Sequence, residues 1–205
     1  NTAREVAGSG GWAAVKTPQL HAMVRKYIDL YIRDEIPGYE EKSARFRYLF
    51  GRLRTTAEDI VDRMAEELAE SDFKPVAFEL GFGGRDGALP AITIQEGDAT
   101  LSVSGKVDRV DGWLHDGKLY LRVVDYKTGR KSFDLTEVFH GLGLQMLLYL
   151  FTLKERGESF YGQPVEEAGV LYLPARDVVV RGRRDMTDAA WQKTVDKELV
   201  RRGLV

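Results

Sequence analysis

Hydrophobic positions in the first third of the chain follow a helical period. From Thr17 onward, apolar side chains recur every three or four residues, a spacing that places them on one face of a helix. The spacing predicts one helix that the Ile-Pro-Gly sequence at 36–38 breaks, and a second over about 43–71. Residues 1–16 are rich in glycine and alanine without a clear period, so we expect an irregular lead-in there. The pattern thus predicts an N-terminal helical part over residues 1–72.

After Pro75 the period shortens to two, which is typical of half-buried strands. Because side chains in a strand alternate between its two faces, Asp125 and Lys127 should point to the same side. We predict strands over 76–82, 91–95, 101–108 and 119–127, and a hairpin turn over 113–118 with Asp116-Gly117 at its tip.

The last third mixes the two periods. Asp134 and Glu137 resemble a capping box that opens a third helix, and the apolar positions that follow run to Phe151 on nearly all sides. We therefore expect this helix to be buried against the sheet. Wholly apolar residues at 168–173 predict an interior strand. A further strand at 178–180 and a closing helix over 186–202 complete an α/β core over residues 73–205.

Composition narrows the class of protein. The 205 residues contain no cysteine, which excludes disulfides, zinc–thiolate sites and thiolate-held clusters within this chain. We expect neither a membrane span nor a secretory signal, because the apolar runs are too short and the first residues lack the basic start of a leader. The net charge of −2 is not that of a domain that holds DNA tightly by itself. This charge favours a module that takes any affinity for DNA from a neighbour, and the absence of cysteine fits a cytosolic setting.

Three residues carry the candidate chemistry. Asp108 ends one predicted strand, and Asp125 ends the strand on the other side of the hairpin. Two carboxylates brought together can bind Mg²⁺ or Mn²⁺, and Lys127 can then orient a water or stabilise charge on a phosphate. Either motif alone is usually a surface ion pair, but their occurrence on adjoining strands is more specific. Two carboxylates and a lysine are the smallest group of side chains that could support metal-assisted cleavage of a phosphodiester.

These motifs resemble those of a known family. Residues 105–109 (Gly-Lys-Val-Asp-Arg), 124–127 (Val-Asp-Tyr-Lys) and 145–149 (Gln-Met-Leu-Leu-Tyr) are similar to the three-part signature of RecB-like nucleases in the PD-(D/E)xK superfamily. Residues 74–83 and 119–145 further resemble the AddB branch of bacterial helicase–nucleases. The resemblance implies a restriction-endonuclease-like α/β fold, with a central mixed sheet of about four to five strands flanked by helices.

The resemblance also implies roles for individual residues. Asp108 and Asp125 would be metal ligands together with the backbone carbonyl of Tyr126, and Lys127 would be the catalytic lysine. The metal would be Mg²⁺ or Mn²⁺.

Supporting residues follow from the same resemblance, with alternatives left open. Gln145 and Tyr149 share a helix face and would position the site or the DNA strand, although a glutamine in an apolar helix needs a hydrogen-bond partner in any case. Glu79 would be a further acidic partner or simply half of an ion pair. His21 lacks the Gly-x-Leu-x-His context of the histidine ligand in related nucleases, and we interpret it as an exposed helix histidine.

By this resemblance the chain would be a Mg²⁺-dependent DNA exonuclease domain of an AddAB- or RecBCD-like helicase–nuclease. It would work in DNA end processing and recombinational repair in the bacterial cytoplasm. Its partners would be an AddA-like helicase–nuclease chain and DNA, single-stranded and delivered by a helicase.

Two departures from the family leave alternatives open. AddB proteins hold an iron–sulfur cluster with cysteines that flank the nuclease domain, so a cluster would belong to the full-length protein and not to this chain. The upstream histidine motif also lies outside the chain. A catalytically incomplete scaffold that binds DNA or a partner helicase is the main alternative, and a stand-alone restriction-type endonuclease is a weaker one.

Overall fold

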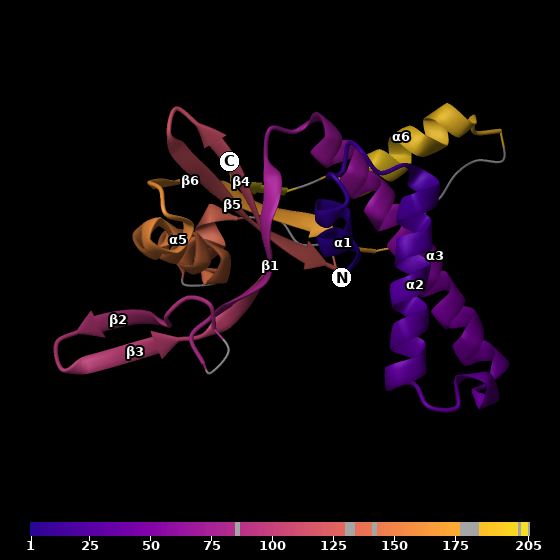
Figure 1. The fold of residues 1–205 in the computed structure, drawn as a ribbon, viewed down its shortest axis with the longest axis horizontal. Coiled ribbons are helices and arrows are strands. Elements are labelled where there is room, and N and C mark those ends of the chain that lie inside the picture. The colour runs from indigo at the N-terminus through magenta and orange to yellow at the C-terminus, as the bar shows by residue number, and fades with distance from the viewer. Residues whose placement is uncertain (85–86, 130–133, 141–142, 177–184, 201, 205) are drawn as a thin grey trace. The chain divides into compact units, whose positions relative to one another are not determined.

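The computed structural model describes residues 1–84, 87–129, 134–140, 143–176, 185–200 and 202–204 (Figure 1). They form two compact units, one built mainly from residues 1–72 and the other mainly from 73–174 together with the C-terminal elements. None of the described helices is both long and apolar enough to cross a membrane.

The first unit is helical. It comprises α1 (Thr2–Gly8), α2 (Thr17–Glu35), a short 3₁₀ turn (Tyr39–Glu41) and α3 (Ala44–Glu70). Ser43 caps α3, because its hydroxyl accepts a hydrogen bond from the backbone N–H of Phe46 at 3.2 Å. The helices α2 and α3 pack together, and an ion pair of 2.6 Å between Arg25 and Glu58 joins them. Both helices lie where the hydrophobic period predicted them.

The irregular lead-in expected over residues 1–16 is wrong for its first half, which forms α1. Val6 on this helix is completely buried, and Glu5 is 2.9 Å from Lys26 on α2. A helix of only seven residues is too short to display a period in the sequence. Packing against a neighbouring helix therefore decides the structure here, rather than local propensity.

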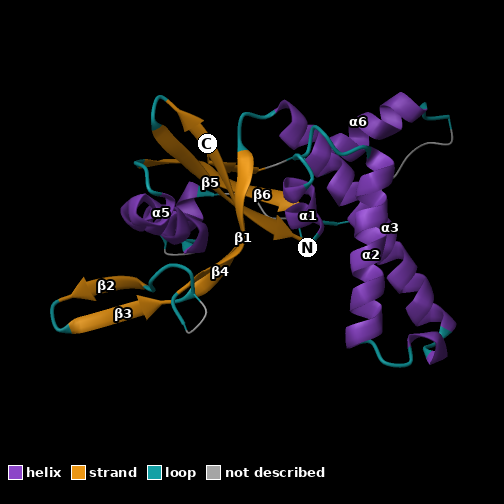
Figure 2. Cartoon of the chain, in the orientation of Figure 1, coloured by secondary structure: helices purple, strands orange, loops and turns teal. Residues whose placement is uncertain are grey.

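The second unit is built on a mixed sheet, whose described strands number five in the order β1-β4-β5-β6-β7 (Figure 2). The β5–β6 pair is parallel, and the other three pairs are antiparallel. This arrangement confirms the predicted α/β fold with a mixed sheet of four to five strands. The strands are β1 (Lys74–Phe82), β4 (Gly105–His115), β5 (Lys118–Lys127), β6 (Val165–Pro174) and β7 (Arg202–Leu204).

A two-stranded ribbon of β2 (Ile92–Glu96) and β3 (Ala99–Val103) stands apart from this sheet (Figure 2). The single strand predicted over 101–108 is therefore two strands that separate at Ser104. Apolar and polar residues alternate in the same way on both sides of the break, so the pattern does not reveal it. The change comes from pairing, since β3 pairs with β2 whereas Gly105 already pairs with Phe82 of β1.

The β4–β5 hairpin turns within two residues. Asp116 and Gly117 have φ values of 47° and 74°, as in the primed turns that suit the twist of a hairpin. The predicted tip is confirmed, but the predicted turn over 113–118 is too wide, because His115 and Lys118 are already paired.

The helix predicted to start after Asp134 is two helices, α4 (Leu135–Phe139) and α5 (Gln145–Tyr161). Asp134 caps α4 as predicted, by accepting a hydrogen bond from Thr136 N–H at 2.8 Å. The expected burial is wrong for α4, where the side chain of Phe139 is 88% exposed. Gly143, with a left-handed φ of 70°, separates the two helices, because a right-handed helix cannot continue through that conformation.

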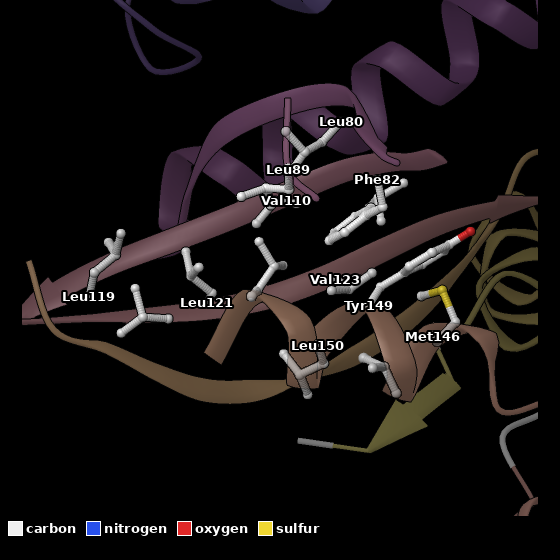
Figure 3. Close-up of a cluster of buried hydrophobic side chains, with 14 of the residues drawn as sticks. Leu80, Phe82, Leu89, Val110, Leu119, Leu121, Val123, Met146, Tyr149 and Leu150 are labelled. Carbon is white, nitrogen blue, oxygen red and sulfur yellow. The ribbon is translucent and has the colours of Figure 1, made fainter. Parts of the chain in front are cut away.

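Helix α5 covers one face of the sheet and closes the main hydrophobic core (Figure 3). It contributes Met146, Tyr149, Leu150 and Leu153 to a cluster with Leu80, Phe82, Val110, Leu121, Val123 and Val170 from the strands. At the C-terminal end, α6 (Asp188–Glu198) lies within the predicted closing helix, and β7 was not predicted. The strand expected at 178–180 lies outside the described residues.

Candidate metal-dependent nuclease site

Two neighbouring strands bring the predicted acidic residues together. Strands β4 and β5 are antiparallel with Arg109 paired to Val124, so the next step along each strand places Asp108 opposite Asp125. Next to this pair, a backbone group of β5 bonds a side chain of β4: the N–H of Tyr126 donates a hydrogen bond to Asp108 Oδ2 at 2.8 Å. Asp108 is thereby fixed to the backbone of the Asp-Tyr-Lys motif.

Lys127 lies beside the second carboxylate. Its Nζ is 2.6 Å from Asp125 Oδ2, and the two side chains are 38% and 18% exposed. The ammonium also lies 5.8 Å from the ring centre of Tyr172 on β6, the residue that pairs with Asp125 across the parallel strands. The predicted same-side arrangement of Asp125 and Lys127 is thus what the structure shows.

The electrostatics of the site favour a bound cation. Partial burial raises the pKa of Asp108, and the nearby negative charges of Asp125 and Glu79 raise it further. The hydrogen bond from the Tyr126 amide opposes this rise. The positive charge of Lys127 also lowers the pKa of Asp108, but it does not cancel the rise that burial causes. A divalent ion would supply further positive charge at this carboxylate. The hydrogen bond with Asp125 raises the pKa of Lys127, which keeps it an ammonium.

The donor set fits Mg²⁺ or Mn²⁺. Asp108 and Asp125 offer hard carboxylate oxygens, and the carbonyl of Tyr126, which the resemblance implies as a ligand, would be a third donor of the same kind. No group of three or more His, Cys, Asp or Glu side chains gathers as a metal cage in the described part of the chain. Mg²⁺ commonly takes one or two protein carboxylates and fills its other positions with water and phosphate, so two carboxylates are enough.

Comparison with known proteins identifies the family. Residues 13–202 match the family model of the PD-(D/E)XK nuclease superfamily. The chain belongs to this superfamily. The match includes all three motifs from which the resemblance was inferred.

Individual relatives agree with this membership. The B-type subunit of the ATP-dependent helicase/deoxyribonuclease of Acetivibrio thermocellus is 39% identical over 164 residues, which are 80% of this chain and 14% of that protein. The same subunit of Clostridium novyi is 32% identical over 98% of this chain and 18% of its own length, and that of Clostridium acetobutylicum is 30% identical over 95% and 17%. These relatives confirm the resemblance to the AddB branch. The chain spans less than a fifth of their length.

The third motif of this PD-(D/E)XK domain lies on α5 and packs against the start of β4. Gln145 Nε2 donates to the hydroxyl of Tyr149 at 2.9 Å within the first turns of α5. Tyr149 is buried and stacks on Phe82 with ring centres 4.9 Å apart (Figure 3). A Cβ atom at Gly105 would lie 1.9 Å from the Tyr149 hydroxyl. The glycine of the first motif therefore makes room for the tyrosine of the third, which ties α5 to the start of β4.

Glu79 forms an ion pair, which is one of the two roles that the sequence left open. Its Oε2 is 2.9 Å from Lys106 Nζ, so it is half of an ion pair, and its side chain is 56% exposed. By the register of β1 and β4 it also lies opposite Asp108, whose pKa it helps to raise. Its φ of 55° is unusual for a residue other than glycine and turns the backbone at this point.

His21 belongs to the helical unit. Its Nε2 is 2.8 Å from Asp62 Oδ2, a contact that links α2 to α3. The histidine lies on a helix as predicted, but the prediction that it is exposed is wrong, because its side chain is only 26% exposed and contacts Asp62.

A group of buried charges on the same strands was not predicted from the sequence. Arg109 and Asp111 are completely buried, and Arg122 is 7% exposed. The available signal was the presence of charged residues at alternate positions, 109 and 111, within an otherwise apolar strand. Charged side chains are rarely buried unless they are paired, so such positions in a core strand point to an internal ion cluster.

Proposed function

We propose that this domain is a Mg²⁺- or Mn²⁺-dependent deoxyribonuclease, an exonuclease that works within an AddAB-like helicase–nuclease. The observation that carries the proposal is the opposition of Asp108 and Asp125 on paired strands, with Lys127 2.6 Å from Asp125. Membership of the PD-(D/E)XK superfamily and the names of the relatives support it.

The chain's own residues would share the chemistry as follows. Asp108, Asp125 and the Tyr126 carbonyl would hold the metal, which when bound supplies charge stabilisation and a more acidic water. Lys127, kept as an ammonium by Asp125, would stabilise negative charge on the phosphate. In the net reaction a water oxygen bonds to phosphorus, the bond to one sugar oxygen breaks, and that oxygen receives a proton.

The substrate and partners are inferred from the relatives. They are named as parts of ATP-dependent helicase/deoxyribonucleases, which supports an AddA-like partner and a role in DNA end processing and recombinational repair in the bacterial cytoplasm. The net charge of −2 supports delivery of single-stranded DNA by other parts of the complex.

Substitution of the site residues tests this function in the intact helicase–nuclease. Asp125→Asn and Lys127→Ala should each lower Mg²⁺-dependent DNA cleavage by about 10²-fold or more, a loss typical of a residue that stabilises transition-state charge. Lys118→Ala is a matched control, because Lys118 lies on the same strand and is also ion-paired, to Glu166 at 3.0 Å. Cleavage at the wild-type rate by either site variant would refute the assignment.

A catalytically incomplete scaffold is the second candidate function. It is favoured by the absence of any cage of three acidic or histidine side chains among the described residues. Titration with Mn²⁺ separates the two functions. A nuclease should bind Mn²⁺ at a site that Asp125→Asn removes, whereas a scaffold should show the same Mn²⁺ binding before and after that substitution.

A further inference from the structure

A buried ion cluster lies behind the candidate site, on the face of the sheet away from α5. Asp111 is paired in register with Arg122 on β5, and its Oδ2 accepts hydrogen bonds from Arg122 Nε and Arg109 Nη2, both at 3.0 Å. Arg109 Nε is also 2.8 Å from Asp111 Oδ1. Val110, the residue between the two partners on β4, points into the core under α5 instead. The cluster and the α5 core therefore occupy opposite faces.

Arg109 connects the cluster to the Asp-Tyr-Lys motif. Arg109 Nη1 donates to the hydroxyl of Tyr126 at 2.9 Å, and its guanidinium lies 5.7 Å from the centre of the Tyr126 ring. The backbone of the same tyrosine is held separately, by the hydrogen bond from its N–H to Asp108. Tyr126 is thus fixed at two points, through its hydroxyl and through its backbone amide.

We propose that Arg109 is a positioning residue for metal binding, acting through Tyr126; this rests on the function proposed above. A backbone carbonyl has no rotamer of its own, so its direction follows the orientation of the whole residue. Anchoring the Tyr126 side chain fixes the direction of the Tyr126 carbonyl and of the neighbouring Asp125. Outer contacts of this kind commonly orient metal ligands.

Arginine suits this task because its planar guanidinium bonds several partners in a fixed geometry. Here one guanidinium reaches the Asp111 carboxylate and the Tyr126 hydroxyl together. Arg109 and Asp111 are completely buried, so neither can move to solvent. Movement of the Tyr126 ring would therefore break a part-buried, charge-assisted hydrogen bond.

The test is a double-mutant cycle on Mn²⁺ binding in the intact protein, read by electron paramagnetic resonance of free Mn²⁺. Only the Mn²⁺ binding that is lost in Asp125→Asn is counted, because that binding is at the proposed site. Tyr126→Phe deletes only the hydroxyl. Arg109→Lys keeps a positive charge beside Asp111 but loses the planar guanidinium that bonds both Asp111 and Tyr126. Each should raise the dissociation constant about tenfold, as expected when an outer contact to a metal ligand is lost. The double variant should be no weaker than the single variants.

Tyr120→Phe is the matched control. Tyr120 lies on β5 an even number of residues from Tyr126, hence on the same face, and contacts Trp113 with ring centres 5.5 Å apart. The Tyr120→Phe variant should bind Mn²⁺ with the same dissociation constant as the wild type. Thermal unfolding of all variants separates a loss of metal affinity from a general loss of stability, since a merely structural cluster would change stability and leave Mn²⁺ affinity unchanged.

Mn²⁺ affinity within about twofold of wild type in Tyr126→Phe, or losses that add in the double variant, would overturn the positioning role. The nuclease function would survive either result, provided that Asp125→Asn still removes Mn²⁺ binding and cleavage. If the wild-type protein binds no Mn²⁺ through Asp125, the proposed function fails, and the positioning role fails with it.

Discussion

At the scale of single residues, Gly105 links the first and third motifs through the space that it leaves open. The position would be unremarkable in an isolated strand, and a side chain would normally help a strand to pack. Here the missing Cβ is required because the Tyr149 hydroxyl occupies its place. Tyr149 cannot easily withdraw, since it is stacked on Phe82 and bonded to Gln145.

Gly105→Ala should therefore destabilise the protein, by about 1–3 kcal/mol, as is usual for overpacking of a core. Urea unfolding followed by circular dichroism measures the change. Gly129→Ala is the control, because a Cβ there would meet no atom within 4 Å and should change the stability by less than about 0.5 kcal/mol. Equal effects of the two substitutions would show that the contact with Tyr149 is not the cause.

At the scale of elements, the sequence predicted best where local signals and tertiary packing agree. The long helix α3 has a capping serine at 43 and a sustained period over many turns, and the Asp116-Gly117 turn has its own conformational preference. The breaks at Ser104 and Gly143 lie within patterns that continue on both sides. At Ser104 the choice of pairing partner decides the break, and that choice is not encoded locally. At Gly143 the left-handed backbone conformation decides it.

The Ser43 cap gives a prediction for α3. Ser43→Ala removes the acceptor for the Phe46 amide and should lower the stability of the helical unit by about 1 kcal/mol. Ser43→Asp, which keeps an acceptor at the same position, should remain close to wild type. Thermal unfolding read by helical ellipticity compares the two variants, and identical melting curves for both would contradict the capping role.

At the scale of the whole molecule, the site depends on chain segments that are far apart in sequence. The parallel pairing of β5 with β6 requires a crossover, and α5 within that crossover carries Gln145 and Tyr149 to the sheet. Motif spacing was enough to predict that Asp108, Asp125 and Lys127 lie close together, the arrangement on which the proposed function rests. The proposed support from Arg109 was not predictable, because motif spacing does not reveal that Arg109 is buried and bonds both Asp111 and Tyr126 on the face of the sheet away from α5.

This architecture also predicts which backbone amides are most protected from hydrogen exchange. Strands β4, β5 and β6 lie inside the sheet with largely buried side chains, whereas most residues of β2 and β3 are exposed. Protection from exchange with solvent depends on the free energy needed to open a segment, and hydrogen bonding alone does not provide it. Hydrogen–deuterium exchange should therefore be slowest in residues 106–114, 119–126 and 166–173, and fast throughout 92–103. Slow exchange in the ribbon would mean that another surface covers it in solution, because its own contacts bury too little apolar area to hold it closed.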